Sequence, residues 1–164
     1  MIPPPSATEI IRRKKQQYCR FADTNQWELF DQIMLPDVRL EFVDRSGSVL
    51  NDGGVTWAVS SREEWKAFCV KIFKGLQTIH IVGEGELEQN GPEEIKAIWG
   101  LLYHVGSEES GGMHSTGGGY YYETWKRQDD DWFLQVDLLS LAGSGLRVFL
   151  LGSDMMGGQV VPND

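Results

Sequence analysis

Cysteine and positive charge are both scarce in this sequence. Its two cysteines, Cys19 and Cys69, fall in helical patterns, which predicts two buried free thiols rather than a disulfide framework. The net charge of −9 argues against nucleic acid and against an anionic membrane as partners, because both need a positive surface. No stretch approaches the roughly 18 uninterrupted apolar residues of a membrane-spanning helix.

The start of the chain and its composition predict its compartment and its domain count. Met-Ile-Pro-Pro-Pro lacks the basic and apolar regions of a signal peptide. With 164 residues, 41% hydrophobic and 24% charged, the chain has the size and composition of one ordinary globular domain. We therefore expect a cytoplasmic, soluble protein with one domain over 1–164, its core at about 6–140 and a C-terminal tail at 141–164.

The apolar periodicity is helical at first and alternating later. Ser6 with Glu9, and Ser61 with Glu64, fit capping boxes, so helical segments are predicted within 6–34 and over 61–75. A Gly- and Ser-rich connection, predicted to be a mobile lid, follows at 106–118. Strands are predicted at 38–42, 77–88, 94–105, 119–128 and 132–140.

This order of elements predicts the fold class. Helices followed by a run of strands are typical of an α+β protein, with helices on one face of an antiparallel sheet. We expect a curved, cone-shaped sheet around the helices and a concave, mostly apolar ligand cavity between them.

An aspartate and two histidines stand out as candidates for chemistry. Asp23, at the end of the first helix, either caps the next helix or presents a carboxylate to the cavity. His80 and His104 fall in predicted strands, where a histidine is either structural or directed into the cavity. Strand alternation places His104 on one face with Leu102.

Several segments occur in an order and at spacings shared with a known family: A-D-T-N-Q-W, P-D-V-R-L-E-F, T-I-H-I-V-G, Y-H and the hairpin Y-Y-Y-E-T-W-K-R-Q-D-D-D-W-F-L. Over 6–140 the chain resembles the NTF2-like superfamily, in its scytalone dehydratase and SnoaL-like polyketide cyclase/isomerase branch. In scytalone dehydratase the matching aspartate and histidines are the acid–base residues, which here are Asp23, His80 and His104.

Other positions differ from the dehydratase. Its two tyrosines that hold a water against the substrate carbonyl correspond here to Ala22 and Phe42. Polar residues that grip its substrate correspond to Gly119 and Tyr121. The resemblance therefore implies a substrate other than scytalone, as for the fungal SnoaL-like isomerases and cyclases that rearrange aromatic polyketides.

The resemblance also implies a mechanism without a cofactor. By the family's arrangement, Asp23 pairs with His104 as the base, and His80 is the acid or binds the carbonyl. The base removes a proton α to a carbonyl, and the enolate is then isomerised or cyclised. Two histidines and a carboxylate also occur in non-haem iron sites, but the close His-x-Asp pair of such sites is missing, so no metal is expected.

Further side chains are predicted to contact the substrate. Glu123 could equally be a surface charge, and His114 a solvated residue of the lid. The predicted set is Tyr18, Phe42, Leu102, Tyr121, Glu123 and His114.

A homodimer is expected as well. Trp99, Leu101 and Tyr103 lie opposite the His104 face of their strand, and an exposed apolar patch of this kind usually marks an interface.

Two alternative functions stay open: dehydration of the scytalone dehydratase type, and a non-catalytic NTF2-like module that binds a small molecule or a protein. If Asp23 lies beyond hydrogen-bond reach of both histidines, the binding module is the better interpretation.

Overall fold

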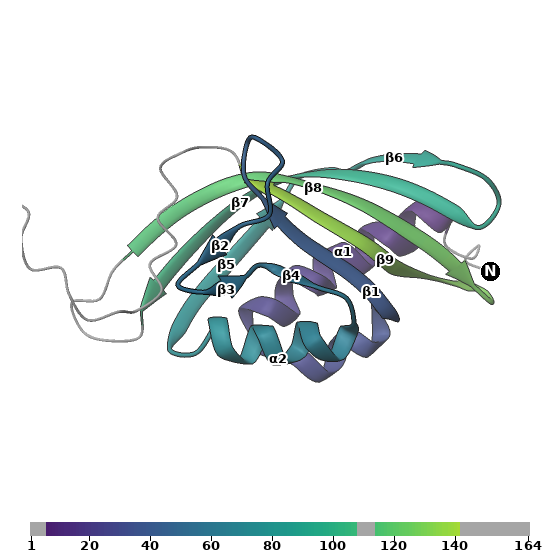
Figure 1. The fold of residues 1–164 in the computed structure, drawn as a ribbon. Helices are drawn as coiled ribbons and strands as arrows, with labels where there is room; N and C mark the ends of the chain where they lie inside the picture. The colour runs from purple at the N-terminus through teal and green to yellow at the C-terminus, as the bar shows by residue number, and fades with distance from the viewer. Residues whose placement is uncertain (1–5, 108–113, 142–164) are drawn as a thin grey trace, which may run out of the picture.

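The computed structural model describes residues 6–107 and 114–141 (Figure 1). Its helical elements are α1 (Ala7–Asp23), the 3-10 helix η1 (Trp27–Gln32) and α2 (Arg62–Ile72). Its strands are β1 (Met34–Val43), β2 (Asn51–Asp52), β3 (Val55–Thr56), β4 (Ala58–Val59), β5 (Leu76–Val82), β6 (Glu86–Gln89), β7 (Glu94–Ser107), β8 (His114–Gln128) and β9 (Asp131–Leu141).

One curved sheet dominates the described residues. Its strands follow the order β4-β1-β9-β8-β7-β5, and β6 pairs with β7. Every pair in it is antiparallel except β1 with β9. Figure 1 shows both helices beneath the concave side of the sheet, with α1 against β5 and β9 and α2 against β1. The predicted α+β fold is confirmed, and over these residues the sheet is open rather than closed into a barrel.

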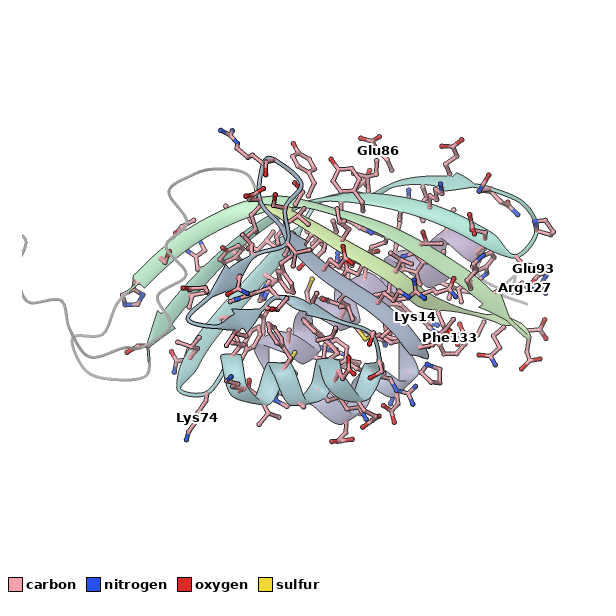
Figure 2. The ribbon with its side chains drawn as sticks, in the orientation of Figure 1. Lys14, Lys74, Glu86, Glu93, Arg127 and Phe133 are labelled. Carbon is pink, nitrogen blue, oxygen red and sulfur yellow. The ribbon has the colours of Figure 1, made fainter. Side chains whose placement is uncertain are left out.

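The position of α1 is fixed at its start and in its middle. Ser6 Oγ accepts a hydrogen bond from the backbone N–H of Glu9, and the Glu9 carboxylate accepts one from the backbone N–H of Ser6, as predicted. Lys14 Nζ then lies 2.7 Å from Asp131 Oδ2 and 3.8 Å from the centroid of the Phe133 ring, which lies beside it in Figure 2. These contacts hold α1 under β9, so that its last residue reaches β5.

The second capping box is shared between two serines. Ser61 Oγ accepts from the backbone N–H of Glu64 as predicted, but the Glu64 carboxylate accepts from the backbone N–H of Ser60 instead.

None of the described helices is long and apolar enough to cross a membrane. The cytoplasmic location stays a prediction.

Several predicted boundaries were wrong. The strand expected at 77–88 is two strands, β5 and β6, and a Cβ at Gly85 between them would lie 2.4 Å from the Trp99 ring. The expected lid at 106–118 is shorter, because β7 continues to Ser107 and β8 begins at His114. Residues 108–113, and the tail after Leu141, lie outside the described residues.

The two faces of β7 are reversed relative to the prediction. Trp99 and Leu101 are 1% and 7% exposed, whereas Leu102 is 47% exposed. Since strand side chains alternate, Tyr103 shares the inner face and His104 lies on the outer one. The dimer prediction depended on Trp99, Leu101 and Tyr103 being exposed, and these residues lie on the inner face, so that basis is lost. The oligomeric state stays a prediction.

Candidate active site

Asp23 lies at the end of α1, directly against β5. Its Oδ1 is 2.6 Å from His80 Nδ1 and accepts a hydrogen bond from the Thr78 hydroxyl at 2.9 Å, and its Oδ2 accepts one from the His80 backbone N–H at 2.9 Å. Three donors from one strand therefore orient one carboxylate. The side chains of His80 and Asp23 are 14% and 16% exposed, so the pair is sheltered but reachable from solvent.

This contact fixes the tautomer of His80. An ionised carboxylate only accepts hydrogen bonds, so in the neutral imidazole Nδ1 carries the proton that faces Asp23. Nε2 is then the nitrogen with the lone pair, and no residue within 6–107 or 114–141 hydrogen bonds to it. An imidazole held in this way can take a proton at Nε2, and Asp23 would stabilise the resulting imidazolium.

Aromatic side chains surround the imidazole. The Phe73 and Tyr103 rings lie 6.3 and 5.9 Å from it, and Tyr103 pairs with His80 across β5 and β7. Burial raises the pKa of Tyr103 to about 12, so its phenol stays protonated at neutral pH and can donate a hydrogen bond. Tyr103 is a site candidate that the sequence interpretation placed on the wrong face.

The predicted pairing of Asp23 with His104 was wrong. His104 is exposed on the outer face, where its Cα partner on β5 is Ile79 and its Nδ1 lies 2.9 Å from the Thr116 hydroxyl. Asp23 lies under the inner face, against His80. Asp23 therefore contacts His80, which was predicted to be the acid or to bind the carbonyl.

Two predicted substrate contacts also lie away from Asp23. Leu102 is on the outer face with His104, because it belongs to the same alternating set. His114, the first residue of β8, is exposed and pairs with Gly106 at the far end of the hairpin from the core. Neither side chain lines the inner face of the sheet.

The remaining aromatic predictions do lie on the inner side. Tyr18 and Tyr121 are 4% and 3% exposed, with ring centroids 6.0 Å apart. Phe42 is half-buried, and its ring lies 6.1 Å from that of Trp65, which in turn is 6.4 Å from the Tyr18 ring. The rings of these side chains form one continuous aromatic cluster beneath the sheet.

Glu123 is buried, and its carboxylate is already hydrogen bonded to other side chains. Its Oε1 accepts from Lys15 Nζ at 2.5 Å, and its Oε2 accepts from the indole N–H groups of Trp99 and Trp125 at 2.6 and 2.7 Å. Both oxygens are thus occupied, which contradicts the predicted contact with substrate. The attraction of Glu123 and Asp137 outweighs burial and holds the pKa of Lys15 above its usual value.

The cysteines and the other possible metal ligands are spread through the described residues. Cys19 and Cys69 are free and buried, as predicted, and burial raises the pKa of Cys19 to about 11. Within the described ranges, no group of three or more His, Cys, Asp or Glu side chains could hold a metal ion.

Solved structures share this architecture at low sequence identity. One is the Kfla4162 protein of Kribbella flavida, 13% identical, with a TM-score of 0.71 over 84% of this chain and 91% of that one. Another is named "Putative Scytalone Dehydratase", from Novosphingobium aromaticivorans, 15% identical, with a TM-score of 0.68 over 82% and 83% of the two chains. They show an α+β fold of the NTF2-like class.

Closer sequence similarity defines the family. A model of the SnoaL-like domain matches residues 6–136, so the chain belongs to the SnoaL-like family. The chain is 53% identical over 132 residues to the "Probable cyclase FGR4" of Gibberella zeae, covering 80% of this chain and 88% of that protein. The resemblance inferred from the sequence motifs is confirmed.

Proposed function

We propose that this protein is an acid–base enzyme of the cyclase or isomerase type, acting on an aromatic polyketide through an enolate. The observation that carries the proposal is the contact between Asp23 and His80, which leaves Nε2 of the imidazole as a base. The SnoaL-like family and a relative named as a probable cyclase support it. An Nε2 to which no described residue hydrogen bonds, beside this oriented carboxylate, is the feature that favours an enzyme over a binding module.

The reaction starts with proton transfer to His80. Nε2 takes a hydrogen from the carbon α to a carbonyl, the electrons of that C–H bond form a C=C bond, and the carbonyl oxygen becomes the enolate oxygen. The Tyr103 hydroxyl is a donor candidate for that oxygen, because its ring lies 5.9 Å from the imidazole. Asp23 stabilises the imidazolium while the enolate exists.

Two outcomes follow from the same enolate. The imidazolium can return its proton to the γ carbon of a conjugated enolate, which gives isomerisation. The enolate carbon can instead attack a second carbonyl of the same molecule, and the new alkoxide then takes the proton, which gives cyclisation. Both schemes need one base, one oxyanion donor and no redox partner.

The first step can be tested without the natural substrate. 1-Tetralone, an aromatic ketone with α hydrogens at C2, is incubated with the protein in deuterated buffer, and deuterium at C2 is followed by NMR. The wild-type protein should accelerate incorporation over buffer, and a chelator should not change the rate. Incorporation no faster than in buffer, or activity that is lost with chelator and restored by iron, would contradict the proposal.

A further inference from the structure

Buried side-chain polar atoms without a partner are rare in folded proteins. In the part of the chain that the structure describes they are Trp57 Nε1, Trp65 Nε1, Arg62 Nε and Asp137 Oδ1. The Arg62 nitrogen lies 3.0 Å from the Asp31 carboxylate and so has a charged neighbour. Two indole donors and one carboxylate acceptor are left.

These three atoms belong to one aromatic cluster under the sheet. The Phe42 ring lies 5.1 Å from that of Trp57 and 6.1 Å from that of Trp65, whose ring lies 6.4 Å from Tyr18. The Tyr18 hydroxyl contacts the carboxyl of Asp137. The cluster thus holds two unused donors and one unused acceptor among aromatic rings, a set of groups that matches an aromatic ligand bearing oxygens.

Asp137 differs from its neighbour Glu123, with which it pairs across β8 and β9. Glu123 has Lys15 and two indoles as donors, whereas Asp137 Oδ1 has none, although Asp137 is only 3% exposed. The cluster contains one cation for two carboxyl groups. Burial raises the pKa of Asp137 to about 7, as expected for a carboxyl whose charge is not fully compensated.

We propose that Asp137 is a substrate-binding residue, whose Oδ1 accepts a hydrogen bond from a phenolic hydroxyl on the part of the substrate farthest from His80. The proposal rests on the proposed function, because it needs a hydroxylated aromatic substrate. Tyr18, which contacts Asp137, and Asp23, which contacts His80, are five positions apart on α1, or about 7.5 Å. A fused-ring molecule is long enough to span that separation.

This carboxyl has opposing effects on stability, because its Oδ1 lacks a donor in the described part of the chain while the buried Tyr18 hydroxyl contacts the same group. A buried acceptor without a donor destabilises the folded state, and an apolar side chain of similar size would not. Asp137→Leu removes the unpaired oxygen but also the contact of the buried Tyr18 hydroxyl, so its stability should lie near that of the wild type. If the residue binds substrate, the same change must weaken the binding of hydroxylated ligands specifically.

Two probes test this by titration calorimetry: 6-hydroxy-1-tetralone and 1-tetralone, which lacks the hydroxyl. We expect the wild type to bind the hydroxylated probe about tenfold more tightly, the effect of one hydrogen bond. Asp137→Leu should bind both probes equally, and Asp137→Asn, which keeps an acceptor oxygen, should retain the preference. Asp130→Leu, at a fully exposed position, is the matched control and should behave as wild type.

The outcomes separate this proposal from the enzyme proposal. A wild type with no preference, or an Asp137→Leu variant that keeps it, would overturn the role of Asp137. Should leucine not fold, Asp137→Ala removes the same oxygen and carries the same expectation. His80→Ala should keep the preference while losing deuterium exchange, so the two proposals can fail independently.

Discussion

Two of the side-chain pairs that join α1 to the sheet, Lys15–Glu123 and Asp23–His80, differ in the hydrogen-bonding groups that they leave unpaired. Lys15 and Glu123 are both 0% exposed, and every oxygen of the carboxylate has a protein donor. His80 and Asp23 are partly exposed, and one ring nitrogen has no partner among the described residues. The two pairs therefore differ in burial. They also differ in hydrogen-bonding capacity, because within 6–107 and 114–141 His80 Nε2 has no partner whereas both oxygens of Glu123 do.

The largest effect is expected from Asp23→Asn. An amide cannot stabilise the imidazolium, and its N–H₂ group can select the wrong tautomer of His80. Deuterium exchange into 1-tetralone should fall by about 10²–10⁴-fold. A folded Asp23→Asn protein with near-normal exchange would show that the pair is structural.

Glu123→Leu should instead damage stability. It leaves the Lys15 ammonium buried without a carboxylate, a defect that costs about 3–5 kcal/mol in similar cases. Urea denaturation measures the free energy of unfolding. The double variant Lys15→Met/Glu123→Leu should recover part of the loss, because the buried charge is gone while the indole N–H groups of Trp99 and Trp125 still lack their acceptor. Equal losses in the single and double variants would contradict this account of the pair.

Tyr103→Phe should have a smaller effect on exchange. It keeps the ring beside His80 and removes one donor to the enolate oxygen, which is expected to slow exchange about ten- to hundredfold. Unfolding temperature is the control and should stay near that of the wild type. If the rate is unchanged, another group binds the enolate oxygen.

The smallest effect is a pH dependence of stability. The pKa of Asp137 lies at about 7, above its ordinary 3.8, because of burial, with Lys15, Tyr18 and Glu123 as the charged and titratable groups around it. Between about pH 4 and 7 the folded protein keeps a proton that the unfolded chain has lost, so stability falls as pH rises through this range. Asp137→Asn should lack this component in denaturation curves, and identical pH profiles would contradict it.

The fold followed from the sequence because its signals are local. The change from helical to alternating period near residue 77 separates the α2 region from the long strands. The split between β5 and β6 was missed, because it depends on Gly85 meeting the Trp99 ring from a neighbouring strand. No local pattern reports that contact.

The site was only partly predictable for a related reason. Alternation shows which residues of a strand share a face but not which face is buried. The bulk of Trp99 and Leu101 indicated the inner face of β7, but the family motif placed His104 there instead. Asp23 and His80 were identified correctly as neighbours of the inner face. Tyr103 and Asp137 emerge only when α1 is packed under the sheet.

The central claim is that His80, not His104, takes the proton. His80→Ala and His104→Ala, each checked for folding by circular dichroism, are compared with the wild type for deuterium exchange at C2 of 1-tetralone. The account predicts that His80→Ala loses exchange by about 10²–10⁴-fold and that His104→Ala, altered on the outer face, exchanges like the wild type. Loss of exchange in His104→Ala with retention in His80→Ala would contradict it.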